Sequence, residues 1–254
     1  MPSYVIIGAS RGIGYQYLQT LSRNPSNIII GTARTPSSVQ AKVTADALPN
    51  VHILQGDLTD AASLSAAATK AAEITGGAVD YLIINGAYLS ESTVFLAPTD
   101  FIGKEKYFQD EFTTSMNTNV AGALYAINTF LPLVKKSSIK KVTVISSGMG
   151  DLDLIVESEV AESVPYAISK AAVNILVAKY AVELKDKGVV FLALSPGVVQ
   201  TSALNADSKF KYAPHFEGPI SPETSVDLQL KVIEGMTLKD SGAFLSHLGT
   251  KKWL

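Results

Sequence analysis

Short apolar runs recur along the chain, separated by stretches with helical spacing, and this alternation restricts the fold more than any other feature. Each run has the length and the β-branched content of a buried strand. We predict seven strands, at residues 4–7, 28–32, 51–55, 80–84, 141–145, 189–194 and 242–246. The pattern predicts an α/β fold, with one doubly wound, seven-stranded, mainly parallel sheet flanked by helices on both faces. Residues 1–254 are expected to form a single domain.

The first strand runs into a glycine-rich turn that opens a helix. Such a turn lets the backbone approach a pyrophosphate, and the helix N-terminus adds N–H donors, as in Rossmann-type folds. An ordinary tight turn is the alternative interpretation. The residues that we assign to the cofactor here are Gly8, Ser10, Arg11, Gly12, Ile13 and Gly14.

The second strand ends in Ala33-Arg34, with no acidic residue nearby. In dinucleotide folds an acid at this point binds the ribose 2′-hydroxyl of NAD, whereas an arginine accommodates the 2′-phosphate of NADP. Arg34, with Arg11 as a second cation, therefore favours NADP(H). Two solvated surface arginines are the alternative.

Polar and small residues follow the other strands, where ligands bind in open α/β sheets. Asp57 could accept a hydrogen bond from an adenine amino group, or it could help to start the next helix, with Asp60 as the competing N-cap. Further cofactor contacts are expected at these strand ends from Leu58, Asn85, Gly86, Ala87, Pro196, Gly197, Val199 and Thr201.

Tyr166 and Lys170 stand four residues apart, on one face of a predicted helix. A nearby lysine cation favours the phenolate and lowers the tyrosine pKa, so the pair could act as a general acid and base. A half-buried tyrosine beside a solvated lysine is the alternative. Asn119 lies inside a predicted helix over residues 104–136, where asparagine either faces solvent or makes a local kink.

Taken together, these motifs make the chain resemble the short-chain dehydrogenases/reductases over essentially its whole length. The motifs are Gly8/Gly12/Gly14, Asp57, Asn85-Gly86-Ala87, Asn119, Ser147, Tyr166/Lys170 and Pro196-Gly197 with Thr201. The family usually has Asn-Asn-Ala-Gly where this chain has Ile84-Asn85-Gly86-Ala87. Ser147 and Tyr166 are 19 residues apart, a longer spacing than usual, which resembles the fungal C-factor-like or sniffer-like carbonyl reductase branch.

The resemblance implies a role for each catalytic residue. Tyr166 would donate a proton to a substrate carbonyl while NADPH delivers hydride, and Ser147, rather than Ser146, would orient the carbonyl oxygen. Lys170 would hold the nicotinamide ribose and lower the tyrosine pKa. Asn119 would position a water that links Lys170 to solvent. Tyr166 and Lys170 are therefore expected to contact the cofactor as well.

Composition excludes several other classes of protein. The chain has no cysteine, and its isolated histidines show no metal-site spacing, so no metal is expected. A net charge of −2 gives no reason to expect a nucleic-acid partner. No signal peptide or membrane span is visible, so a cytoplasmic protein is expected. The resemblance leaves a homodimer or homotetramer open.

The function expected is NADPH-dependent reduction of a ketone or aldehyde, reversible as an alcohol dehydrogenase and compatible with a natural-product pathway. An NADP(H)-binding sensor or scaffold without turnover is the alternative. We expect loops 86–99, 148–165 and 199–217 to bound the substrate pocket. Aromatic residues in the last of these, Phe210, Tyr212 and Phe216, favour a bulky apolar or aromatic substrate. The acidic run over residues 151–162 is more typical of a solvated surface.

Overall fold

The computed structural model describes residues 1–201 and 218–253, and within them lie all seven predicted strands. Each observed strand agrees with its prediction to within two residues at either end. The strands are β1 (Ser3–Ile7), β2 (Ile28–Ala33), β3 (Val51–Gln55), β4 (Tyr81–Ile84), β5 (Lys141–Ile145), β6 (Val190–Ser195) and β7 (Phe244–Ser246).

The strands form one parallel sheet in the order β3-β2-β1-β4-β5-β6-β7. The chain builds outward from β1 to β3 and then returns to place β4 on the other side of β1. This reversal of strand order is the point where ligands bind in doubly wound sheets. The predicted fold class is confirmed, and every pairing between these strands is parallel.

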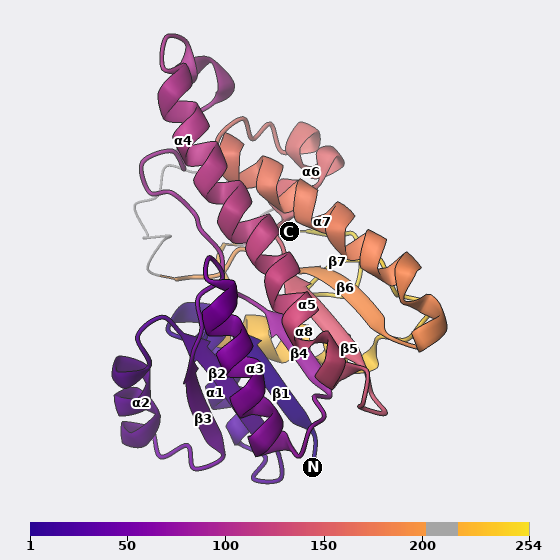
Figure 1. The fold of residues 1–254 in the computed structure, drawn as a ribbon. Helices are drawn as coiled ribbons and strands as arrows, with labels where there is room; N and C mark the ends of the chain where they lie inside the picture. Colours follow the sequence, from indigo (N-terminus) through magenta and orange to yellow (C-terminus); the bar gives the residue numbers. More distant parts are fainter. Residues whose placement is uncertain (202–217, 254) are drawn as a thin grey trace.

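Helices cover both faces of the sheet (Figure 1). The α-helices are α1 (Gly12–Ser22), α2 (Pro36–Ala45), α3 (Ala61–Thr75), α4 (Glu105–Met116), α5 (Gly122–Val134), α6 (Leu152–Glu157), α7 (Val164–Glu183) and α8 (Pro222–Gly235). Three 3-10 turns, η1 (Pro98–Phe101), η3 (Gly148–Gly150) and η4 (Lys185–Lys187), and a π-helical turn, η2 (Asn117–Ala121), complete the described elements.

Alternate residues of each strand pack on opposite helical layers, as the two-residue period of a strand requires. In β1, Val5 and Ile7 pack in the core under α3, α5 and α7. Tyr4 and Ile6 pack in the second core, under α1, α2 and α8. Because both faces are covered, the strands are continuously apolar rather than alternating.

The helix predictions need three corrections. The helix expected over residues 104–136 is divided into α4, η2 and α5, because the backbone widens into a π turn around Asn119. Helix α2 was not predicted, since Val39 and Val43 are its only buried residues. Helix α6 was not predicted within the insertion, since it has only six residues and buries none of them.

Helix α3 resolves the choice between two candidate caps. The Asp60 carboxylate accepts hydrogen bonds from the Ala62 and Ser63 amides, so Asp60 is the N-cap. Asp57 lies ahead of the helix and accepts from Thr59 instead. Across residues 1–201 and 218–253, no helix combines the length and apolar character needed to cross a bilayer.

Candidate active site

The glycine turn after β1 packs against the segment after β4 with almost no space between the two backbones. A Cβ added to Gly8 would lie 2.5 Å from the Gly86 Cα, and one added to Gly14 would lie 2.1 Å from the Gly8 carbonyl oxygen. Gly8 also has a φ of 86°, which disfavours other residues. Asn85 fixes the arrangement by donating from Nδ2 to the Gly8 carbonyl at 2.8 Å.

The departure at Ala87 does not disturb this turn. Ala87 is exposed and does not have a positive φ, so the backbone there does not require the glycine that the family usually has. Leu58 is buried beneath the same region, where it limits the space next to both Gly86 and Gly122.

Gly12 remains open to solvent at the start of α1, and Thr201 lies beside it. A Cβ on Gly12 would be 3.5 Å from the Thr201 methyl carbon, so the segment after β6 reaches the phosphate-binding turn. Within that segment, Gly197 has a φ of 81° and packs on the ring of His247. Val199 is buried and bridges to Ile220.

The three arginines of the chain differ in their surroundings. Arg23 forms ion pairs with Glu223 and Asp227 of α8. Arg11 and Arg34 are exposed, and the guanidinium group of neither has an ion pair or hydrogen bond with any described residue. Two guanidinium groups without a partner in residues 1–201 or 218–253 thus lie at the glycine turn and at the end of β2. With the close-packed glycines, they fit a dinucleotide that carries an additional phosphate.

The two serines at the end of β5 make different contacts. Ser146 is buried and donates to Asn174 Oδ1 at 2.6 Å. Ser147 is less buried, its hydroxyl accepts from the Met149 amide, and it lies close enough to the Tyr166 phenol to act on the pKa of that group. The structure therefore brings Ser147, and not Ser146, to the tyrosine.

Lys170 lies one helical turn after Tyr166, with Nζ 5.5 Å from the centroid of the phenol ring. Its ammonium is buried and donates to the Ile145 carbonyl at 2.8 Å. Burial lowers the pKa of Lys170 to about 8. Burial also raises the pKa of Tyr166 to about 12, an effect that the nearby Ser147 hydroxyl partly opposes.

The direction of the Tyr166 shift differs from the prediction that Lys170 lowers this pKa. The lysine approaches the ring and bonds a backbone carbonyl, while loss of solvent dominates at the phenol. In this state of the protein Tyr166 is protonated at neutral pH, as a proton donor must be.

Asn119 is buried in the π turn, and its side chain joins two other segments. Its Oδ1 accepts from the Tyr88 amide at 2.7 Å, and its Nδ2 donates to the Tyr88 carbonyl at 3.0 Å and to Ser169 Oγ at 2.8 Å. The predicted kink is thus a π turn that aims Asn119 at the segment after β4. The sequence analysis assigned no role to Tyr88. It assigned none to Ser169 either, although Ser169 lies inside the Tyr166–Lys170 motif.

The insertion over residues 148–165 packs against the catalytic helix. A Cβ on Gly150 would lie 2.8 Å from the Ala171 amide, and one on Gly148 would meet Leu154 and Trp253. Asp151 caps α6, while Asp153, Glu157 and Glu159 are exposed, in agreement with a solvated acidic surface. The aromatic residues Phe210, Tyr212 and Phe216 lie outside the described residues.

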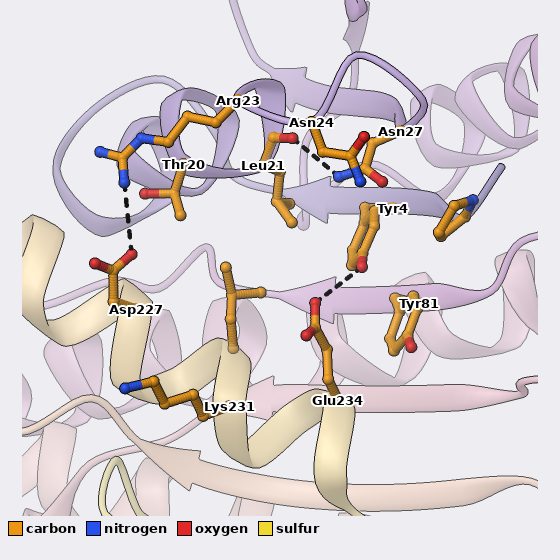
Figure 2. Close-up of a pocket in the computed structure, with 12 residues that line it drawn as sticks. Tyr4, Thr20, Leu21, Arg23, Asn24, Asn27, Tyr81, Asp227, Lys231 and Glu234 are labelled. Carbon is orange, nitrogen blue, oxygen red and sulfur yellow. Dashed lines mark hydrogen bonds and ion pairs between the residues drawn. The ribbon is translucent and has the colours of Figure 1, made fainter.

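A cavity of about 720 Å³ lies far from these groups, near the amino ends of β1 and β4 (Figure 2). Tyr4 stacks on Tyr81 there and donates to Glu234, and Arg23 pairs with Asp227. Because ligands of open α/β sheets bind at the carboxyl ends of the strands, we place the active site at the opposite edge. Within the described ranges, no cluster of three potential metal ligands occurs.

Known proteins resemble this chain over most or all of its length. The family model described as short chain dehydrogenase matches residues 3–211. The chain is 42% identical to the short-chain dehydrogenase/reductase AacuF of Aspergillus aculeatus over 268 residues, with all of both chains covered. It is 38% identical to the short chain dehydrogenase virK of Hypocrea virens, again over the full length of both.

Two solved structures also resemble the chain over nearly its whole length. The NADPH-bound carbonyl reductase from chicken fatty liver is 27% identical, with a TM-score of 0.80 over 98% of this chain and 93% of that one. The carbonyl reductase Sniffer of D. melanogaster shares the fold, with a TM-score of 0.82 at 20% identity and 98% coverage of both chains.

Proposed function

The chain belongs to the short-chain dehydrogenase/reductase family, and on that premise we propose that it is an NADPH-dependent reductase of ketones or aldehydes. The observation that carries this proposal is the grouping of Ser147 beside Tyr166 with Lys170 one turn further along α7. In the opposite direction the same groups would oxidise an alcohol.

Each of the three side chains has a role that follows from its contacts. Ser147 donates a hydrogen bond to the substrate carbonyl oxygen and orients it toward Tyr166. Tyr166 then donates its phenolic proton to that oxygen as negative charge develops on it. When bound, the cofactor supplies the hydride. Lys170 keeps a positive charge beside the phenol ring, which stabilises the tyrosine as it loses its proton.

The tyrosine pKa favours the reductive direction. A pKa raised to about 12 keeps Tyr166 protonated at neutral pH, as carbonyl reduction requires. Alcohol oxidation would need the phenolate, which is scarce under those conditions. Carbonyl reduction is therefore the direction that we propose to assay first.

NADP(H) is the cofactor proposed for this chain. Gly8, Gly12 and Gly14 would hold its pyrophosphate, and Arg34 with Arg11 would pair with the 2′-phosphate. The likeness to the chicken carbonyl reductase, which was solved with NADPH bound, supports this choice. The roles of Asp57 at the adenine, and of Pro196, Gly197, Val199 and Thr201 at the nicotinamide end, stay predictions.

Substitution of Arg34 tests the cofactor assignment. Arg34→Gln should weaken NADPH binding by roughly tenfold or more, because charge-assisted hydrogen bonds are among the stronger ones, and should leave NADH binding almost unchanged. Arg23→Gln is the matched control, since Arg23 is already paired with α8. Equal affinity of the unaltered protein for NADH and NADPH, measured by calorimetry, would contradict the proposal.

The reaction itself is tested by following NADPH oxidation with a panel of ketones, aldehydes and quinones. We expect turnover with bulky apolar or aromatic carbonyl compounds, of the kind made in fungal secondary metabolism. NADPH binding without turnover on any of them would favour the alternative, a sensor or scaffold protein. A cytoplasmic location and a homodimer or homotetramer stay predictions.

A further inference from the structure

Ser163, the residue before α7, has a backbone conformation that serine rarely adopts. Its φ is 62° and its ψ is 34°, in the left-handed region. Three other non-glycine residues among those described have a positive φ, Ala47, Lys140 and Glu159, and none of them is buried. Ser163 is 3% exposed. A strained residue that is also buried is held in place by its surroundings.

The Ser163 hydroxyl does not make the contact that its position would favour. A serine at an N-cap normally has an extended backbone and accepts a hydrogen bond from the first turn of its helix. Here no side-chain cap forms, and the hydroxyl donates to the Val94 carbonyl at 2.6 Å. The Ser163 carbonyl accepts from the Ala167 amide at 2.9 Å, so the residue joins α7 to the segment after β4.

A second serine joins the same two elements on the other side of Tyr166. Ser169 Oγ donates to the Tyr166 carbonyl at 2.7 Å and accepts from Asn119, which holds both backbone groups of Tyr88. Residues 88–94 are therefore bound at both ends to the helix that carries Tyr166. The two serines stand three residues before and three residues after that tyrosine.

We propose that Ser163 is a positioning residue that fixes residues 88–94 as a substrate wall at a set distance from the Tyr166 hydroxyl. The proposal rests on the proposed reductase function. Loop 86–99 is expected to bound the substrate pocket, so a carbonyl substrate with its oxygen at Ser147 and Tyr166 would place its substituents against this wall. The left-handed backbone of Ser163 directs its hydroxyl away from α7 and toward the Val94 carbonyl.

Two substitutions separate the hydrogen bond from the backbone strain. Ser163→Gly removes the hydroxyl, but glycine accepts a positive φ, so the fold should be retained. Ser163→Thr keeps a hydroxyl, but a β-branched residue is disfavoured at a positive φ, so the melting temperature should fall. Ala47→Gly is the matched control, because Ala47 is exposed, has a φ of 51° and lies beyond α2.

We expect Ser163→Gly to lower kcat/KM on the best carbonyl substrate about five- to tenfold, the effect of one hydrogen bond, mostly through KM. NADPH affinity should stay the same, and the melting temperature should change little, because relief of the strained backbone offsets the unpaired Val94 carbonyl. Ser163→Thr should keep kcat/KM and lose stability. A Ser163→Gly enzyme with unchanged kcat/KM, or losses of kcat/KM that simply follow the melting temperatures of the variants, would overturn the proposal.

Hydrogen exchange tests the wall without turnover and so separates this proposal from the reductase function. The Leu96 amide, which donates to the Thr93 carbonyl at 3.1 Å, should exchange faster in Ser163→Gly. The Tyr88 amide, held by Asn119, should not change. Unchanged exchange at Leu96 would refute the bracing role. Failure of the unaltered protein to reduce any carbonyl would refute the function alone.

Discussion

Ser146 and Ser147 are adjacent in sequence, yet only Ser147 lies beside Tyr166, where we propose that it orients the substrate carbonyl. Ser147→Ala should lower kcat by about 10²–10³, the range seen when one donor to a developing oxyanion is lost. Ser146→Ala should instead leave Asn174 Oδ1 without its donor and lower the free energy of unfolding by about 1–3 kcal/mol, with kcat close to wild type. Steady-state kinetics and denaturant unfolding of both variants separate the two effects, and the reverse pattern would reassign the catalytic serine.

Tyr166 is expected to act through its hydroxyl and not through its ring. Tyr166→Phe keeps the shape and removes the proton, so kcat should fall by at least ~10²–10⁴, the usual contribution of positioned acid catalysis. NADPH affinity should change little. Tyr180→Phe is the matched control on the same helix, because that hydroxyl bonds Asn128. Near wild-type turnover by Tyr166→Phe would disprove the central assignment.

Lys170 should set the alkaline limit of activity. Its pKa is lowered from 10.5 to about 8, so its charge is lost as pH rises through about 8, whereas Tyr166 keeps its proton up to about 12. The kcat/KM for reduction should therefore fall above about pH 8. In Lys170→Arg this fall should move to higher pH, since arginine stays protonated. An unshifted fall would exclude the lysine as its cause.

Deprotonation of Lys170 does not destabilise the fold, so unfolding caused by this residue cannot explain the fall in kcat/KM above about pH 8. Between pH 8 and 10.5 the unfolded chain holds a proton on Lys170 that the native chain has released, so the contribution of this group to stability rises with pH. Tyr166 acts in the opposite sense only above pH 10, where the unfolded chain loses the phenolic proton first. Circular dichroism across the same pH range checks that the fold persists.

Among the elements, the π turn η2 has the clearest consequence. It places a buried asparagine where it bonds the Tyr88 backbone on both sides, so Asn119→Ala would leave that amide and carbonyl unpaired. We expect a loss of about 1–3 kcal/mol in stability for the unpaired groups and faster exchange of the Tyr88 amide. Asn128→Ala, on the same run of helix, is the control. Protection of the Tyr88 amide in Asn119→Ala would show that the turn holds without its side chain.

The elements that the sequence predicted are those with strong patterns. Strands buried on both faces read as continuous apolar runs, so all seven were found. Helices α2 and α6 were missed because each buries too few side chains to produce a clear period. A π turn has no sequence period of its own, and Asn119 signalled an irregularity without specifying its form.

For the whole molecule, topology explains which parts of the site could be predicted. Residues at strand ends share one sheet edge, so the order of strands places Gly8, Asn85, Ser147 and Gly197 together, whereas the role of Ser147 came from the family resemblance. The hydrogen bond from the Ser163 hydroxyl to the Val94 carbonyl joins residues 69 positions apart in the sequence. No local sequence pattern predicts it. The lowered tyrosine pKa was predicted from spacing, but burial of both side chains decided the direction.

The central position of β1 also matters while the chain is being made. One edge of β1 pairs with β2, but the other pairs with β4, which ends at Ile84. A nascent chain leaving the ribosome therefore carries a mostly apolar strand with one unpaired edge until some fifty residues beyond β2 have followed. Such an edge is a template for pairing with other chains. The strand at the centre of the finished sheet is thus open to mispairing during synthesis.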